Sequence, residues 1–342
     1  MQQKIYCYII MTNLTIKNKG TTVKGTNVKG TTVRGTKKNR KIQKNTLPKH
    51  LDKNIVAQQM HPGLTLESAI QDFQSLQKIN CNATKLSVRN GVNFVDYFTM
   101  KHRLETKGKE GITFYELWDQ RAYYKTKNYV KNIIEFYKKT GIIKNELRVF
   151  LRIYNLYFGA VNIFKPIIAM DIYCRYKPKS VLDMTMGWGG RLVGACALNI
   201  PKYTGIDLNT KLEKSYTEMV KVLKQHSSTE INLYFKDALD VDYSKIDYDL
   251  VLTSPPYYNI EQYEGQKVME KEQWNREFYI PLFEKTWKYL KKGGHYCLNI
   301  PIEIYEQTAI QVMGKANTMI PLTKSKRKVD DKYKEYIYVW KK

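Results

Sequence analysis

The sequence predicts an α/β fold in which a mainly helical region precedes a mostly parallel, doubly wound sheet. Apolar residues recur at helical spacing before residue 160, whereas short β-rich runs alternate with helical segments from about residue 179. Strands that alternate with crossover helices form parallel sheets. The 342 residues exceed one small module and fit two domains plus a tail, at roughly 100–200 residues per domain.

The strands are predicted from short apolar runs, at 180–183, 203–207, 232–235, 250–253, 295–300 and 336–340. Helix candidates lie between these runs, at 189–199, 210–226 and 277–292. Ligands of doubly wound sheets bind at the carboxyl ends of the strands. The chemistry of the chain is therefore expected at those ends.

Two amphipathic stretches precede the sheet, the first from Leu64 to Leu76 and the second from Tyr115 to Lys139. In the second stretch lysines interleave with aromatic residues, a composition that suits base stacking and phosphate binding. Aromatic residues at helical spacing are more often core, with the lysines as a solvated face. We favour the core interpretation.

The chain is strongly basic, with 57 Lys and Arg against 32 Asp and Glu and a formal net charge of +25. Residues 1–60 hold 13 basic residues and one acidic residue, which accounts for +12 of that charge. A basic chain indicates a polyanionic partner, either nucleic acid or an anionic membrane. The alternative is an AT-rich genome, whose codons favour Lys, Asn, Ile and Tyr.

Residues 1–60 are expected to form a disordered basic tail. Glycine recurs every five residues between Gly20 and Arg34, which disfavours a helix, and the basic run from Lys37 to Lys41 repels itself. Such a tail would be a phosphate-binding arm or a nuclear address. The alternative is that the segment only solubilises the protein, or that translation starts at Met11 or Met60 and the preceding residues are not part of the protein.

The sequence predicts an intracellular protein, cytoplasmic or nuclear, that binds neither membrane nor metal. No segment approaches the ~20 continuous apolar residues of a membrane span, and the apolar run 5–11 is shorter than a secretory signal. The cysteines are odd in number and widely scattered: Cys7, Cys81, Cys174, Cys196 and Cys297. We therefore expect reduced cysteines, without a disulfide framework or a structural zinc site.

The first strand of the sheet ends in an acidic residue and a glycine-rich turn, from Asp183 to Arg191. Glycines let a backbone turn tightly and approach a ligand closely. The turn lacks the full G-x-G-x-x-G pattern, because Leu192 stands at its third glycine position. With Asp183 before the glycines, the loop suits a sulfonium cofactor with an amino-acid tail better than NAD.

Acidic residues also follow the next two strands. Asp207 lies 20 residues after Gly187, where a nucleoside-binding Rossmann-like unit places its ribose-binding carboxylate. Asp237 follows the third strand, where a side chain can reach an adenine amino group. Each residue alone is compatible with a turn or cap role. Acidic residues at three successive strand ends together predict a nucleoside site.

The fourth strand ends in the most specific motif, Ser254-Pro255-Pro256-Tyr257. The two prolines stop the strand and present backbone carbonyls without competing N–H groups. The Ser254 oxygen and the Pro255 carbonyl can both accept from one exocyclic amino group, which keeps the nitrogen lone pair available for attack on a methyl group. Tyr257 would offer a flat face to a flipped-out base. The alternative is a surface turn with a packed tyrosine.

At these residues the chain resembles the class I S-adenosylmethionine-dependent methyltransferases of the amino-methylating type. Their signature is Asp, Asn or Ser, then Pro-Pro, then Tyr, Phe or Trp, which Ser254–Tyr257 matches. The resemblance covers about residues 161–342. It implies S-adenosyl-L-methionine as cofactor and a Rossmann-like seven-stranded sheet whose last strand, within 332–340, is antiparallel.

The resemblance also implies a role for each matching residue. Asp183, Gly187 and Gly189 would bind the cofactor, with the two glycines along its methionine portion. Asp207 would bind the ribose and Asp237 the adenine.

Two further segments of the chain match the family. Lys165, in Phe164-Lys165-Pro166, resembles a motif near the carboxylate of the cofactor. The catalytic residues implied are those that hold the target amine: Ser254, Pro255, Pro256 and Tyr257.

The chain departs from the family pattern in places. The family commonly has Asp-Pro-Phe before the glycines, whereas this chain has Asp183-Met184-Thr185. Serine at 254 resembles the bacterial cytosine-N4 enzymes, while aspartate is usual for adenine-N6. Little sequence separates Tyr257 from the next strand, so residues 61–160 are expected to recognise the target.

The sequence therefore predicts an N-methyltransferase that acts on an exocyclic amino group of a nucleobase, at cytosine N4 or adenine N6, with DNA favoured over RNA. Three alternatives stay open: an RNA base methyltransferase, a protein amide methyltransferase with the related Asn-Pro-Pro-Tyr signature, and a non-catalytic nucleic-acid-binding subunit. The positive charge favours nucleic acid over protein as the partner.

Overall fold

The computed structural model describes residues 52–83, 88–159, 161–260, 268–322 and 335–342. The tail predicted for residues 1–60 lies mostly outside these ranges. Its last residues do not fit the prediction, because helix α2 (Lys53–Met60) is formed and Val56 and Met60 are buried.

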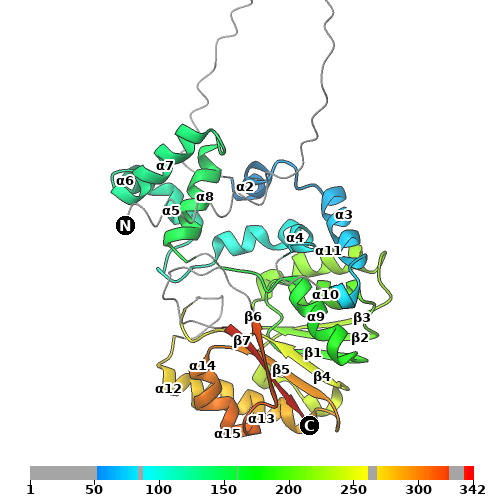
Figure 1. Cartoon of the computed structure of the whole chain (residues 1–342). Helices are drawn as coiled ribbons and strands as arrows, with labels where there is room; N and C mark the ends of the chain where they lie inside the picture. The colour runs from blue at the N-terminus through cyan, green and yellow to red at the C-terminus, as the bar shows by residue number, and fades with distance from the viewer. Residues whose placement is uncertain (1–51, 84–87, 160, 261–267, 323–334) are drawn as a thin grey trace, which may run out of the picture. The chain divides into compact units, whose positions relative to one another are not determined.

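A seven-stranded sheet has the order β3-β2-β1-β4-β5-β7-β6 (Figure 1). Its strands are β1 (Ser180–Asp183), β2 (Lys202–Asp207), β3 (Glu230–Phe235), β4 (Leu250–Thr253), β5 (His295–Ile300), β6 (Thr318–Leu322) and β7 (Glu335–Lys341). Strands β1 to β5 run parallel, and β7 is antiparallel to both β5 and β6. The predicted doubly wound sheet with an antiparallel last strand is confirmed.

Strand β6 has no counterpart among the predicted strands. It pairs only with β7 and therefore forms an edge of the sheet. It contains Pro321, which lacks an N–H donor and is tolerated at an edge. A short run interrupted by proline gives no clear strand pattern.

The helices around the sheet are α9 (Pro166–Tyr176), α10 (Gly190–Ala197), α11 (Glu213–Leu223), α12 (Lys271–Trp274), α13 (Ile280–Tyr289), α14 (Ile302–Ile304) and α15 (Ile310–Met313). Three of them, α10, α11 and α13, agree with the predicted segments in place but are shorter, whereas the other four have no counterpart among the predicted helices. Five-residue π-helical segments, η6 (Asn275–Tyr279) and η7 (Tyr305–Ala309), precede α13 and α15.

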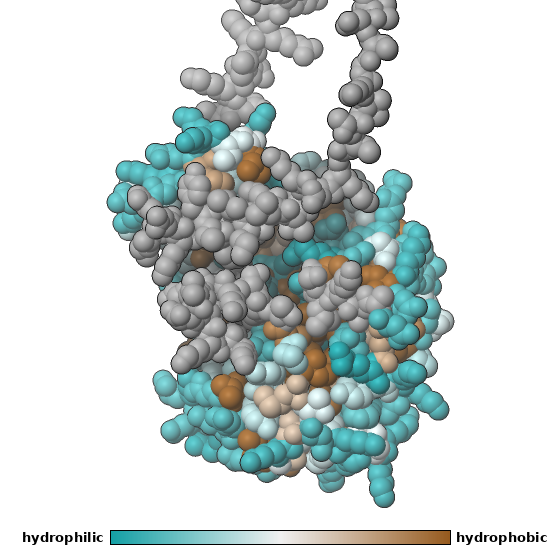
Figure 2. Space-filling view, viewed as in Figure 1, coloured by the Kyte–Doolittle hydropathy of each residue, from teal (hydrophilic) through white to brown (hydrophobic). Residues whose placement is uncertain are grey.

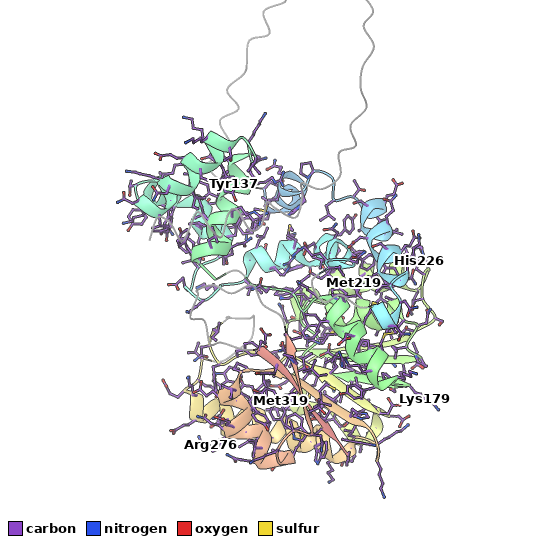
Figure 3. The ribbon with its side chains drawn as sticks, viewed as in Figure 1. Tyr137, Lys179, Met219, His226, Arg276 and Met319 are labelled. Carbon is purple, nitrogen blue, oxygen red and sulfur yellow. A yellow bond between two sulfur atoms is a disulfide. The ribbon has the colours of Figure 1, made fainter. Side chains whose placement is uncertain are left out.

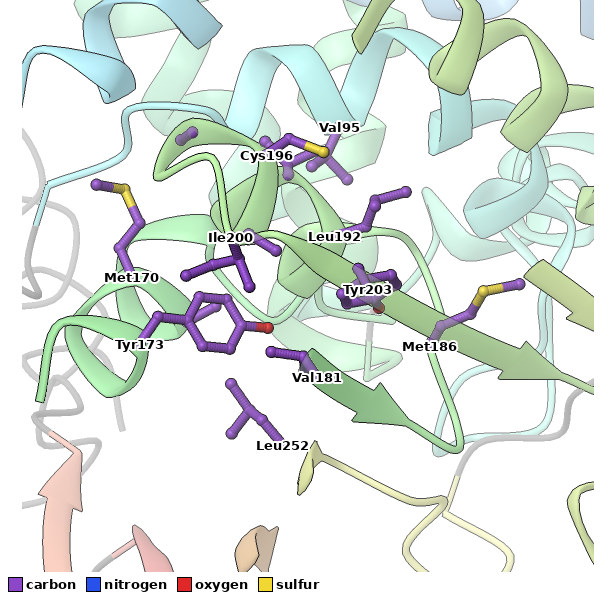
Figure 4. Close-up of a cluster of buried hydrophobic side chains, with 14 of the residues drawn as sticks. Val95, Met170, Tyr173, Val181, Met186, Leu192, Cys196, Ile200, Tyr203 and Leu252 are labelled. Atoms are coloured by element: carbon purple, nitrogen blue, oxygen red, sulfur yellow. The ribbon is translucent and has the colours of Figure 1, made fainter. Parts of the chain in front are cut away.

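Both faces of the central strands β1, β4 and β5 are buried, as a doubly wound sheet requires. Successive residues of a strand point to opposite faces, so Val181 joins one core cluster and Leu182 the other. On the first face, Tyr173 of α9 and Leu192 of α10 share this cluster with Val181, and the Tyr173 ring points towards Val181 (Figure 4). Helix α13 contributes Phe283 to the cluster on the second face.

Helices α3 (Leu66–Gln77) and α4 (Val92–Glu105), which precede the sheet in the chain, belong to the same core as the sheet. Phe73 of α3 and Phe94 of α4 lie 5.2 Å apart between ring centroids and are fully buried in the first cluster. A disulfide also joins Cys81 to Cys174 of α9. The expectation of reduced cysteines is wrong for this pair, which lies 93 residues apart in sequence. Cys196 and Cys297 are free and buried.

The second amphipathic stretch divides into several helices with an aromatic core of their own. They are α5 (Phe114–Asp119), α6 (Arg121–Tyr124) and α7 (Asn128–Thr140), followed by α8 (Glu146–Tyr157). Trp118 packs edge-on against Phe150 of α8 at 5.6 Å. The core interpretation is confirmed for Trp118 and Tyr137 (Figure 3), which are buried, but it is wrong for Tyr123, which is 55% exposed.

Candidate functional site

The glycine turn after β1 is fastened to β2 and α11. Gly187 has φ +57° and Gly189 has φ +89°, conformations that glycine adopts without steric cost. The Gly187 N–H donates to Asp207 Oδ2 at 2.7 Å, and the Tyr216 hydroxyl donates to the Gly187 carbonyl at 2.8 Å. A Cβ on Gly187 would have only the Thr185 carbonyl within 4 Å, at 3.9 Å. The turn is thus rigid, and its Gly187 side is open to a ligand.

Gly189 and Gly190 serve packing. The Sδ of Met219, labelled in Figure 3, lies 3.1 Å from where a Cβ on Gly189 would stand. A Cβ on Gly190 would lie 1.8 Å from the Phe164 carbonyl oxygen, so no other residue fits there. This close approach holds the segment containing Lys165 against the glycine turn. Lys165 is half-buried, and burial lowers the pKa of its ammonium group, as does the nearby charge of Arg89.

Asp207 is a carboxylate without a cationic partner among the described residues. Its Oδ2 accepts from Gly187, and its Oδ1 accepts the Asn209 N–H at 2.9 Å. Burial raises the pKa of Asp207 to about 6, although these two backbone donors favour the ionised form. The exposed side chain of Leu208 follows it. A ligand hydroxyl would supply the further donor that this charge lacks.

Asp183 has a structural role instead of the predicted ligand contact. Its side chain is fully buried, and Oδ2 accepts from Arg191 Nε at 2.7 Å and from the Tyr203 hydroxyl at 2.6 Å. Its Oδ1 accepts from the Thr253 hydroxyl at 3.0 Å. Both oxygens are therefore used inside the protein, where they join β1 to α10, β2 and β4.

The hydroxyl of Thr253 connects the two predicted halves of the site. The Oγ1 atom of Thr253 lies 2.6 Å from the Oγ1 atom of Thr185 in the glycine turn. Thr253 is also the residue immediately before Ser254 in the chain. The Arg191 guanidinium donates in addition to the Thr185 carbonyl. The glycine turn and the Ser-Pro-Pro-Tyr turn thus lie side by side at the carboxyl edge of β1 and β4.

Asp237 begins the 3-10 turn that follows β3. Its Oδ1 accepts the Leu239 N–H at 2.9 Å, which is a capping contact, and its side chain is half-buried. The structure thus gives Asp237 a local role at the expected strand end.

The backbone of the Ser-Pro-Pro-Tyr turn and of the residue after it is held by one further tyrosine. The Tyr279 hydroxyl, from π-helix η6, donates to the Pro256 carbonyl at 2.6 Å and accepts the Tyr258 N–H at 3.0 Å. Tyr258 has φ +53°, a strained conformation for a tyrosine, and its side chain is buried. Such strain persists only where the surroundings enforce it, and it is common at functional sites.

The side chains of the turn meet a residue that the sequence analysis missed, Asn299 of β5. The Tyr257 hydroxyl lies 3.0 Å from both the carbonyl oxygen and the Oδ1 of Asn299, and Ser254 Oγ lies 3.1 Å from the Tyr257 hydroxyl. Tyr257 is therefore anchored at the far end of its ring. The available signal was a single amide side chain within the otherwise apolar run of β5.

Within the described ranges, no group of three or more His, Cys, Asp or Glu side chains could hold a metal ion. In the same ranges no helix has both the length and the apolar character needed to span a bilayer.

Replacement of Asp183 by Ala tests its structural role. The Arg191 guanidinium would be left buried without its carboxylate, and breaking a buried pair in this way costs about 3–5 kcal/mol. We expect that loss in the free energy of unfolding measured by urea titration. The control Asp247→Ala removes an exposed pair with Lys291 and should cost at most about 1 kcal/mol. Equal losses in the two variants would contradict the role of Asp183.

No family model and no curated protein matches the sequence. Among solved structures, the chain is similar to an rRNA methylase from Streptococcus thermophilus, with 14% identity over 52% of this chain and 97% of that one, and a TM-score of 0.36. It is also similar to TrmN from Thermus thermophilus, with 15% identity over 51% of this chain and 48% of that one, and a TM-score of 0.35. A third is an S-adenosylmethionine-dependent methyltransferase from Clostridium acetobutylicum, with 14% identity over 52% of this chain and 64% of that one, and a TM-score of 0.33. Each similarity covers about half of this chain.

Proposed function

We propose that this protein transfers a methyl group from S-adenosylmethionine to an exocyclic amino group of a nucleobase. The observation that carries the proposal is the position of the Ser254–Tyr257 turn. It follows β4 directly beside the glycine turn of β1, and the hydroxyls of Thr253 and Thr185 join the two turns at 2.6 Å. An amine acceptor site next to a nucleoside site is the arrangement that methyl transfer to an amine needs.

The residues at the carboxyl ends of β1, β2 and β3 fit the proposed cofactor. Gly187 would face its methionine portion, because the Gly187 side of the turn has no Cβ and is open, and Gly189, packed against Met219, would support the turn from behind. Asp207 would accept hydrogen bonds from the ribose hydroxyls, which would give its half-buried charge a further partner. Asp237 would reach the adenine and Lys165 the carboxylate. When bound, the cofactor supplies an electrophilic methyl group on a sulfonium.

The residues after β4 would position the amine. Ser254 Oγ and the Pro255 carbonyl would each accept one amine hydrogen, which directs the nitrogen lone pair towards the cofactor site. Pro255 is buried and Tyr279 holds the next carbonyl, so this geometry is fixed before substrate arrives. Positioning of this kind is a large part of catalysis in a displacement reaction. The anchored ring of Tyr257 would stack on the base.

The charge of the helical region supports nucleic acid as substrate, with DNA as our first choice. Residues 121–158 contain nine Lys and Arg against Glu135 and Glu146. Hydrophilic residues cover the outer side of α6 and α7 on the face seen in Figure 2. Lys127 Nζ lies 4.2 Å from the ring centroid of Tyr123, so a cation and an exposed aromatic face occur together. Such pairs suit phosphates and unstacked bases.

The first prediction from this function concerns which polymer is methylated and how the rate depends on the Ser254–Tyr257 turn. Purified protein is incubated with methyl-labelled S-adenosylmethionine and DNA, RNA or protein, and the digested products are identified by mass spectrometry. We expect N-methylated nucleosides from DNA. Tyr257→Ala and Pro255→Ala should lower the rate about 100-fold or more, because the amine loses its position, while cofactor affinity stays largely unchanged.

The control for these variants is Tyr289→Ala, which removes an exposed tyrosine at the end of α13. It should leave the rate of transfer unaltered. Methylated nucleosides from RNA alone would make RNA the substrate. Loss of cofactor binding in the Tyr257 or Pro255 variants would show that these residues belong to a different pocket.

The second prediction is a pH dependence of cofactor binding. The pKa of Asp207 is raised to about 6, so the carboxylate that accepts from the ribose is lost as the pH falls through that value. One pH unit below its pKa, a carboxylate is only about one-tenth ionised, and affinity for S-adenosylhomocysteine in calorimetry should fall accordingly. Asp207→Asn should bind weakly without this transition, whereas Asp237→Asn should keep it. A wild-type affinity that is constant between pH 5 and 8 would exclude the role of Asp207.

The third prediction places nucleic acid on α6 and α7. Lys127→Ala with Lys131→Ala should weaken oligonucleotide binding, measured by fluorescence anisotropy. It should also reduce the slope of log affinity against log salt by about 1–2, because each phosphate contact contributes nearly one unit. The matched pair Lys288→Ala with Lys292→Ala removes two exposed lysines elsewhere and should change neither quantity. Equal effects of both pairs would mean that only overall charge matters.

A further inference from the structure

We infer that Asn299 is a positioning residue that fixes the Ser254 hydroxyl as a hydrogen-bond acceptor for the target amine. The inference rests on the proposed function, because it concerns how the same turn holds an amine. It adds a residue from β5 to a site otherwise built from the ends of β1 to β4.

The orientation of the Asn299 amide is set by β7. Its Nδ2 donates to the Tyr336 carbonyl at 3.1 Å, and only the nitrogen of an amide can donate to a carbonyl. Its Oδ1 therefore faces the Ser-Pro-Pro-Tyr turn. The side chain is 3% exposed, so it is held in this orientation within the sheet.

The hydrogen bonds at the turn then constrain the Ser254 hydrogen. Ser254 and Tyr257 contribute one hydroxyl hydrogen each. The Asn299 atoms that face them are acceptors: the carbonyl oxygen and Oδ1 lie 3.0 Å from the Tyr257 hydroxyl, and Oδ1 lies 3.3 Å from Ser254 Oγ. With Tyr257 donating to Asn299, the Ser254 hydrogen points to Asn299 or to Tyr257. Ser254 thus keeps a lone pair for an outside donor.

This constraint matters because a serine, unlike an aspartate, can both donate and accept. If Ser254 donated to the amine, it would occupy the nitrogen lone pair that has to form the new bond. Substrate would still bind, but in an unreactive orientation. Loss of Asn299 is therefore expected to lower kcat much more than it changes KM.

The test is a double-mutant cycle on methyl transfer. Ser254→Ala and Asn299→Leu should each lower kcat about 10-fold or more. The double variant should be no slower than Ser254→Ala alone, because Asn299 acts through Ser254. Single losses that multiply in the double variant would show independent effects and overturn the inference. Affinity for S-adenosylhomocysteine and the urea midpoint serve as controls for folding.

A rescue variant separates orientation from packing. Ser254→Asp places an acceptor-only carboxylate in the turn, so adding it to Asn299→Leu should restore much of kcat. No restoration would overturn the inference. If Asn299→Leu destabilises the sheet, Asn299→Thr gives the same comparison, because threonine suits a strand. A threonine hydroxyl can donate as well as accept, so it cannot force Ser254 to be the donor in the hydrogen bond between the two residues. If the unaltered protein methylates no amine, the proposed function fails as well. If it is active but the losses multiply, only the role of Asn299 fails.

Discussion

The buried carboxylate of Asp183 is the interaction on which the site depends. It accepts hydrogen bonds from Arg191, Tyr203 and Thr253, which belong to α10, β2 and β4. A buried charge is tolerated only when it is paired and its lone pairs are satisfied. Here that requirement joins three elements to the end of β1. The glycine turn and the proline turn keep their relative positions because both are fastened to this one group.

Two carboxylates at neighbouring strand ends thus have opposite environments. Asp183 lies against a guanidinium and has no contact left to offer, whereas Asp207 has only backbone donors, and burial raises its pKa. The first arrangement stabilises the fold. The second maintains a partly desolvated acceptor, as a binding site for hydroxyl groups requires.

The sequence predicted the parallel strands closely, because each is an apolar run that ends at a turn signal. It could not reveal β6, whose proline breaks the pattern, nor the pairing of Cys81 with Cys174, since these cysteines meet only through the packing of η2 (Cys81–Ala83) on α9. The glycine and proline turns were found because local chemistry determines them. The contacts of Asp183 with Tyr203 and Thr253 and the contact of Asn299 with Ser254 join residues of different strands, and no spacing in the sequence encodes them.

The burial of Phe73 and Phe94 in the first core cluster makes α3 and α4 part of one hydrophobic core with the helices and strands of the sheet. A fragment that begins at residue 161 would expose the apolar faces of α10 and α11, which α3 and α4 cover. Helices α6 and α7, on which we propose nucleic-acid binding, contribute no residue to this shared core. A chimera that exchanges specificity would have to replace α5 to α8 and leave α3 and α4 with the sheet.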